Sequence, residues 1–421
     1  MYAPLSWRRI AVAFLLCVLA CGQAAQARVA RPDALDRRVD AIASARLASL
    51  PATRLVDPDR QAAAAHLERL DLVGWFAMVL FQVILLLYFW RSGHAGRWRD
   101  LLRRRIRSEH LVRFVFGAGL AGLAALAALM PQFFLYRVAR VMQLSDRLTI
   151  PWAQRWLLHT IALMLLAGII ATVILMLADR THQWYLITIG GVYLAVLCGA
   201  FVQPFLDPSM GRAITPLHPA LAGAVARLER RAGIGAIPVV VVDRSRKTQT
   251  DGARVVGLGP TMHIELGDTL VAGDPSPEVL FATARQLGHV AQNDPLRSAL
   301  LLATLTVLAT ALAVFIADRV GFRRDDDPVS RLALVGALLG CAFILAVPVE
   351  NAYRAHMAAS ADAYAVRLTG NRTAGERAMI RWADEGMELV CPDVMERLFL
   401  LPQPSIASRV AMLNGVSPRC P

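Results

Sequence analysis

Long apolar runs constrain this chain more than any other feature of its sequence. A helix needs about 20 predominantly apolar residues to cross the hydrocarbon core of a bilayer. Runs close to this length occur at residues 71–90, 112–131, 157–178, 184–205, 296–318 and 330–350. Hydrophobic residues make up 56% of the 421 residues and charged residues only 18%, a balance too apolar for a soluble protein of this size. The sequence therefore predicts a mainly α, polytopic membrane protein.

The N-terminal region 1–27 is predicted to be either a signal sequence or a first membrane span. Arg8 and Arg9 precede a short apolar stretch, and small residues follow it up to Ala27, an order typical of bacterial signal sequences. Cys21 leaves a lipoprotein cleavage site as a third possibility. Composition does not distinguish these alternatives.

The formal net charge of +13 comes almost wholly from arginine, since Lys247 is the only lysine. Most arginines lie in short connectors beside apolar runs, where positive charge sets membrane orientation. This distribution disfavours nucleic acid as a partner and points to membrane lipids. With a cytoplasmic N-terminus, the arginine-rich connectors would lie inside, which predicts a bacterial inner-membrane protein whose polar domain is periplasmic. No charged residue lies at the centre of a clear span, which disfavours a transporter or channel.

Two polar pieces separated by membrane spans are expected to build any functional site. The apolar and polar parts divide the chain into the regions 1–27, 28–70 (polar and helical), 71–205 (four spans), 206–295, 296–350 (two spans) and 351–421. Within 206–295 the residue pattern predicts a helix at 217–231, strands at 239–242, 253–257 and 262–266, and a second helix from Ser276 to about Asn293. The polar pieces are therefore expected to form a small α+β domain.

The six cysteines offer one candidate disulfide and no metal site. Cys391 and Cys420 lie in the polar C-terminal region, where they would pair if that region faces an oxidising compartment. Cys198 and Cys341 lie inside apolar runs, where a small buried thiol is the simplest interpretation. Because no Cys-x-x-Cys spacing occurs, a cysteine zinc site is not supported.

The predicted helix beginning at Ser276 carries a degenerate metalloprotease motif. Its residues Arg285, Gln286 and His289 stand where zincin proteases have His-Glu-x-x-His. In that motif two imidazoles one helical turn apart face one zinc ion, and the glutamate takes a proton from zinc-bound water. The match is weak by itself and depends on its surroundings.

Those surroundings make the match specific. Similar segments lie at 216–217, 228–229, 240–246, 257–259, 264–270, 276–278, 350–352, 361–365 and 404–409. With them, the chain resembles the integral-membrane zinc endopeptidases of the CAAX prenyl protease type over most of its length. The resemblance implies a zincin-like polar domain set on membrane spans. In eukaryotic members this domain faces the cytosol, opposite to the side that the loop charges favour.

The chain departs from this family at the residues that carry the chemistry. The resemblance implies that Arg285 replaces the first histidine ligand, Gln286 the general base and Ala358 the third ligand, a glutamate, while His289, Asp362 and Arg409 are retained. It also places Gly252 where an asparagine holds the substrate backbone, and Gln403 where a histidine precedes Pro404.

Two requirements of zinc catalysis therefore fail independently. A catalytic zinc ion normally takes three protein ligands plus water, and a guanidinium has no lone pair to offer. Gln286 keeps the shape of glutamate but cannot accept the proton. We expect a pseudoprotease without a cofactor, with no catalytic residue intact, that binds or scaffolds membrane-protein or peptide clients. The alternative is an active zinc-dependent metalloendopeptidase with non-standard ligands.

The replaced positions also predict a new contact. Positions 285 and 289 share one helix face, positions 358 and 362 share another, and the two faces meet at the metal in the active fold. Arg285 is therefore expected to reach Asp362 and to put a fixed positive charge where zinc would lie. His289, His356 and Asp362 are the remaining set that could rebuild a metal site, and His263 is expected to be exposed or hydrogen-bonded.

Overall fold

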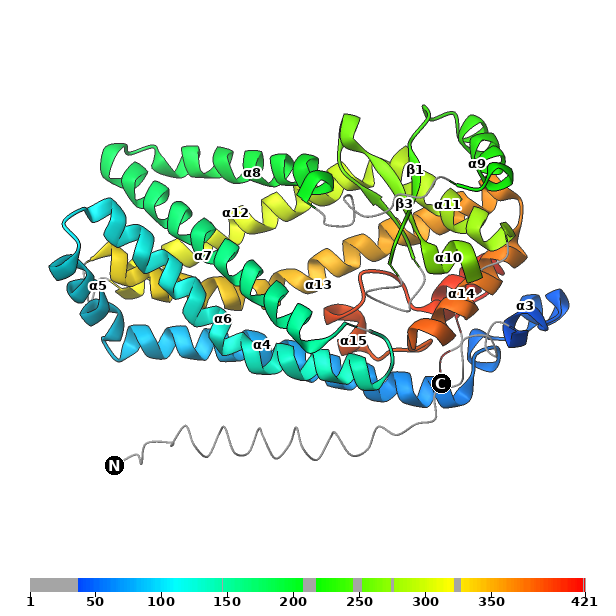
Figure 1. Cartoon of the computed structure of the whole chain (residues 1–421), viewed down its shortest axis with the longest axis horizontal. Coiled ribbons are helices and arrows are strands. Elements are labelled where there is room, and N and C mark those ends of the chain that lie inside the picture. The colour runs from blue at the N-terminus through cyan, green and yellow to red at the C-terminus, as the bar shows by residue number, and fades with distance from the viewer. Residues whose placement is uncertain are drawn as a thin grey trace.

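In the part of the chain that the structure describes, six long apolar helices run along the long axis, and each is long enough to cross a membrane (Figure 1). They are α4 (Pro58–Arg91), α6 (Glu109–Val141), α7 (Thr149–Arg180), α8 (Trp184–Leu206), α12 (Asp294–Gly321) and α13 (Pro328–Thr369). The computed structural model describes residues 37–145, 147–206, 217–244, 252–273, 276–321, 327–418 and 420. Within these ranges the expected spans are confirmed, and the chain is an integral membrane protein. The predicted signal sequence or first span at 1–27 lies outside the described residues.

Close packing of small residues holds part of the bundle together. A Cβ atom added at Gly117 of α6 would lie 2.7 Å from the Cβ of Ala171 in α7. One added at Gly168 of α7 would lie 2.8 Å from the backbone oxygen of Phe114. Glycine therefore lets the two backbones approach, as is common between helices in membranes, where hydrophobic burial drives no association.

Residues 91–108, which carry seven arginines, lie at the end of the bundle opposite the polar domain (Figure 1). Helix α5 (His94–Arg105) closes this end, and Arg103 forms ion pairs with Glu109, at 2.6 Å, and with Asp327. Arg113 of α6 reaches Asp179 of α7 at 2.6 Å. These pairs connect the ends of several spans on one side.

The polar domain is built on a three-stranded sheet with the order β1-β3-β2. Its strands are β1 (Val239–Val242), β2 (Ala253–Val256) and β3 (His263–Gly267), and β3 runs parallel to β1 and antiparallel to β2. Ile264 and Leu266 of β3 point into a buried core together with residues of α11 (Ser276–Ala291). The expected strands and the expected α+β domain are confirmed.

Shorter helices complete this domain. They are α3 (Ser44–Ser49), α9 (Pro219–Ala232), α10 (Asp268–Gly273), α14 (Arg372–Gly386), α15 (Val394–Phe399) and α16 (Ile406–Leu413), with single 3₁₀ turns at Ala52–Arg54 and Gly259–Thr261. Phe281 and Leu287 of α11, Met379 and Ile380 of α14 and Ile406 of α16 are fully buried in the shared core.

Two long helices pass from the bundle into the polar domain without a break. Helix α4 begins at Pro58, well before the apolar run, because the Asp57 side chain accepts hydrogen bonds from the backbone N–H groups of Asp59 and Arg60, both at 3.0 Å. Helix α13 continues from its apolar part to Thr369. Rigid helices thus hold the polar domain against the membrane part, although sequence composition suggested boundaries near residues 70 and 350.

Asp384 of α14 anchors the segment that precedes α4. It accepts hydrogen bonds from Arg38 and from the backbone N–H of Asp57, both at 2.8 Å. Its side chain is fully buried, and this burial raises the pKa of Asp384 to about 6, although both donors favour the charged form.

The stability of the polar domain is expected to increase as the pH falls from 7 to 5. An unfolded aspartate has a pKa near 3.9, so between that value and about 6 the folded chain binds the proton more tightly. Stability from this linkage is present at low pH and is lost as pH rises through the folded pKa, with an effect on the order of 2 kcal/mol. Melting curves in mild detergent should show the trend. Asp384→Asn should make the profile shallower and the exposed Asp59→Asn should leave it unchanged; an equally steep profile in Asp384→Asn would refute this assignment.

Candidate functional site

Helices α11 and α13 cross where the degenerate motif lies. Gly288 of α11 stands at the crossing, and a Cβ atom added there would lie 3.2 Å from the Cα of Ala361 and 3.2 Å from the Cβ of Tyr364. Because these contacts are tight, the two backbones lie close together. The helix face that carries Arg285 therefore meets the face that carries Asp362.

The centre of the site is one carboxylate held by two guanidinium groups. Arg285 donates from Nε to Oδ1 of Asp362 at 2.8 Å, which confirms the predicted contact. Arg409 of α16 donates from Nε to Oδ2 at 2.7 Å and from Nη2 to Oδ1 at 3.1 Å. Gln403 accepts from both arginines through Oε1, at 3.3 and 3.4 Å. The side chain of Asp362 is fully buried.

Both arginines remain cations in this setting. Burial is the largest influence on Arg285 and lowers its pKa, while Asp362 opposes the shift. Burial also disfavours the Arg409 cation, but the charge and the hydrogen bonds of Asp362 outweigh it and raise the pKa of Arg409. Since an arginine starts from so high a pKa, neither loses its proton at accessible pH. The site therefore holds two fixed positive charges against one carboxylate.

The retained histidine lines the same cavity as Arg285 and bonds a residue outside the cluster. His289 shares a hydrogen bond at 2.8 Å between its Nδ1 and Oδ2 of Asp294, at the start of α12. The sequence interpretation overlooked Asp294, although it stands five residues after His289, in the Asn-Asp-Pro that ends α11. Ala358 is buried and offers no donor atom.

The other histidines do not complete a metal site. His356 is exposed, and His263 is buried beside Glu265, with 3.3 Å between its Nε2 and Oε1 of the glutamate. Across the described residues no three histidine, cysteine, aspartate or glutamate side chains converge in a way that could hold a metal ion. The donor set present at the former ligand positions does not fit zinc.

Two cavities meet at the replaced motif. The first, of about 630 Å³, lies against α4, the end of α14 and residues 400–403. The second, of about 900 Å³, lies between α8, β2, α12 and α13, and Ala358 and His289 line it. Ala253, Arg285, Gln286 and Gln403 line both cavities. The motif therefore stands at the junction of a large two-part hollow.

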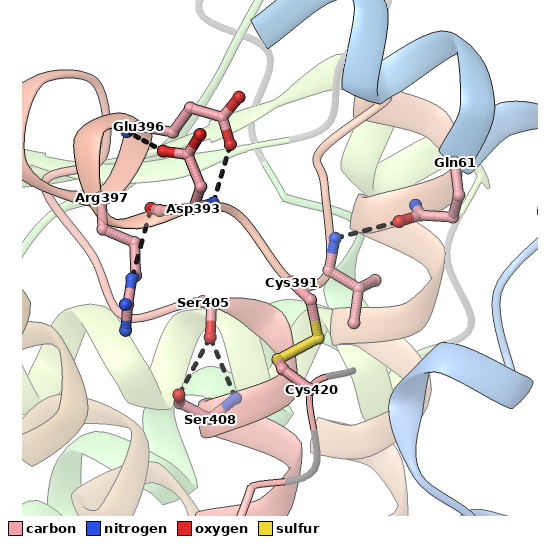
Figure 2. Close-up of a disulfide and its surroundings, with 9 residues drawn as sticks. Gln61, Cys391, Asp393, Glu396, Arg397, Ser405, Ser408 and Cys420 are labelled. Carbon is pink, nitrogen blue, oxygen red and sulfur yellow. Dashed lines mark hydrogen bonds between the residues drawn. A yellow bond between two sulfur atoms is a disulfide. The ribbon is translucent and has the colours of Figure 1, made fainter. Parts of the chain in front are cut away.

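A disulfide holds the loops around this hollow. Cys391 and Cys420 are bonded, as the sequence predicts, with 5.6 Å between their Cα atoms (Figure 2). Next to Cys391, the backbone N–H of Val390 donates to Gln61 of α4 at 3.0 Å. Ser405 caps α16, accepting from the backbone N–H of Ser408 at 3.2 Å (Figure 2). These contacts position the helix that carries Arg409.

The polar domain is similar in sequence to known proteins. Residues 218–417 match the family model described as "Peptidase family M48". A protein of Bacillus subtilis (strain 168) called "Uncharacterized metalloprotease YhfN" is 26% identical over 223 residues, which is 50% of this chain and 51% of that protein. The chain thus spans about half the length of this relative.

A solved structure shares the fold over nearly the whole length. It is titled "Crystal Structure of S. mikatae Ste24p" and superposes with a TM-score of 0.74, at 16% identity, covering 91% of this chain and 96% of that one. The match includes the membrane helices as well as the polar domain. The polar domain is therefore similar in sequence to peptidase family M48, and the whole chain shares the fold of the Ste24p structure.

Proposed function

We propose that this chain is a zinc-free pseudoprotease that binds or scaffolds membrane-protein or peptide clients without cleaving them. The observation that carries the proposal is the guanidinium of Arg285, which occupies the first ligand position and is bonded to Asp362. A dication at this point would meet two guanidinium groups and no free carboxylate oxygen, because both oxygens of Asp362 are bonded to Arg285 and Arg409. The neutral amide of Gln286 cannot remove a proton from water.

The hollow on both sides of Arg285 supports the binding half of the proposal. Strand β2 is an edge strand of the described sheet, and its residues Ala253, Arg254 and Val255 line the larger cavity. An extended peptide can add to such an edge through main-chain hydrogen bonds, while neighbouring pockets take its side chains. A volume of about 900 Å³ accommodates a short stretch of polypeptide.

The alternative is an active metalloendopeptidase with non-standard ligands. It requires three donor atoms at one point. Asp362 is bonded to two arginines, His356 is exposed, and among the described residues no three such donors converge. This arrangement favours the inactive form.

Binding without cleavage is the expected result with purified full-length protein in detergent. A fluorescent, apolar octapeptide should raise its anisotropy on binding and be recovered intact after long incubation with added zinc. Labelled casein should likewise remain uncut. Cleavage that a chelator abolishes would support the alternative, and absence of any peptide binding would contradict the scaffold role.

We further propose that the polar domain faces the periplasm of a bacterial inner membrane. The seven arginines of residues 91–108 lie at the opposite end of the bundle, and the positive-inside rule places such a connector in the cytoplasm. The disulfide between Cys391 and Cys420 supports the same side, because such bonds persist in oxidising compartments.

A reporter fused after Pro421 tests this orientation. Alkaline phosphatase, which needs an oxidising compartment, should be active there, and green fluorescent protein exported through the same route should be dark. The opposite pair of results would place the domain in the cytoplasm, as in the eukaryotic relatives.

A further inference from the structure

The cavity of about 630 Å³ has an acidic wall that the lost zinc chemistry does not explain. Glu68 and Asp71 of α4 and Glu388, just after α14, all line it. Glu68 is only 7% exposed, and its Oε2 has no hydrogen-bond partner among the described residues. Oε1 of Glu388 and the indole Nε1 of Trp382, both lining the same cavity, are likewise buried without a partner.

Buried polar atoms without a hydrogen-bond partner indicate that a ligand binds in the cavity and satisfies them. Each such atom destabilises the folded state when nothing satisfies it, and here three of them belong to residues that line one cavity. The position of Glu68 is fixed by its other oxygen, which accepts a hydrogen bond from the backbone N–H of Leu389 at 2.9 Å. The free oxygen of Glu68 is therefore a preformed acceptor, and a ligand can use it without rearranging the wall.

The balance of charge selects a cation. Arg285 and Arg409 also line this cavity, but both are bonded to Asp362, which neutralises one of the two. Three carboxyl groups then face one uncompensated positive charge, and a cation bound beside them would favour their ionised form. The remaining wall is largely apolar, formed by Leu67, Trp75, Met78, Leu135, Leu144 and Leu400. Such a wall suits a cationic group that is carried on an apolar chain.

We propose that this cavity is a specificity pocket for a lysine or arginine side chain of a client polypeptide. The inference rests on the proposed client-binding function and adds the kind of residue that the client presents. The two cavities adjoin, because they share the lining residues Ala253, Arg285, Gln286 and Gln403. A client chain that lies along β2 in the larger cavity can therefore direct a side chain into the smaller one. The ammonium or guanidinium then lies against Glu68 and Asp71, and its methylene stem against Trp75.

A panel of labelled octapeptides tests the pocket without any mutation. The peptides are apolar and identical except for one central residue: lysine, arginine, norleucine or glutamate. Anisotropy titrations of the full-length protein in detergent should give the lysine and arginine peptides at least about tenfold tighter binding than norleucine, since pairing a buried charge is worth this or more. The glutamate peptide should bind weakest.

Variants then assign the preference to the acidic wall. Glu68→Gln combined with Asp71→Asn should reduce the lysine preference to near that of norleucine, while Asp59→Asn, an exposed site on the same helix, should retain it. Equal binding of the lysine and norleucine peptides by the unaltered protein overturns the inference but leaves client binding intact. Binding of none of the four contradicts both. If dodecylamine binds as tightly as the lysine peptide and competes with it, the occupant is an amphiphilic amine and the polypeptide assignment is wrong.

Discussion

Asp362→Ala is expected to destabilise the folded protein by about 3–5 kcal/mol, the largest effect of any single substitution at the site. The reason is that Asp362 is fully buried and is the hydrogen-bonded counter-ion of both Arg285 and Arg409. Its removal leaves two cations without the carboxylate that both of them bond. Denaturant titration in mild detergent measures the free energy of unfolding directly.

A matched control lies on the same helix. Glu350 pairs with Arg354 at 3.3 Å, one helical turn apart, and both side chains are partly exposed. Glu350→Ala should therefore change stability by less than about 1 kcal/mol. Combining Asp362→Ala with Arg285→Met should recover part of the loss, because one of the two unpaired cations is then gone. An Asp362→Ala variant no less stable than Glu350→Ala would contradict the assigned role of the carboxylate.

Restoring the three replaced positions is expected to restore zinc binding. In the variant Arg285→His/Gln286→Glu/Ala358→Glu, two histidines one turn apart on α11 would face a glutamate on α13. Positions 285, 289 and 358 already line one cavity. We expect a rise from almost no bound metal to roughly one zinc ion per chain, with chelator-sensitive cleavage of casein.

A second variant separates the ligands from the base. Arg285→His/Ala358→Glu, with Gln286 kept, should bind zinc but cleave roughly 10²–10⁴ times more slowly than the triple variant, which is the usual contribution of a general base. Metal analysis and initial rates on the same preparations give both quantities. If the triple variant folds and still takes up no zinc, the remaining framework no longer supports a metal site.

The parts of this structure that depend on local pattern could be predicted from the sequence. Apolar length predicted the six spans in the described chain, and residue alternation and capping predicted the strands and α11. The contact between Arg285 and Asp362 could also be predicted, because helical periodicity places both residues on faces that the family fold brings together.

The parts of the structure that depend on long-range packing could not be predicted from the sequence. The hydrogen bond between Glu68 and Leu389 joins residues 321 positions apart, and no local periodicity of the sequence predicts a contact over such a separation. Composition assigned Glu68 to a separate polar segment, because nothing in the pattern shows that α4 begins at Pro58. The hydrogen bond between His289 and Asp294 also lies outside the motif, because Asp294 begins the helix that follows α11.

The metal content of the purified full-length protein tests the central claim most directly. After dialysis against buffer containing trace zinc, elemental analysis should find far less than one zinc ion per chain, because a guanidinium occupies the first ligand position and the third offers no donor. Zinc that is held in a one-to-one ratio and resists dialysis would show that three donors do converge, and the account of an inactive site would then be wrong.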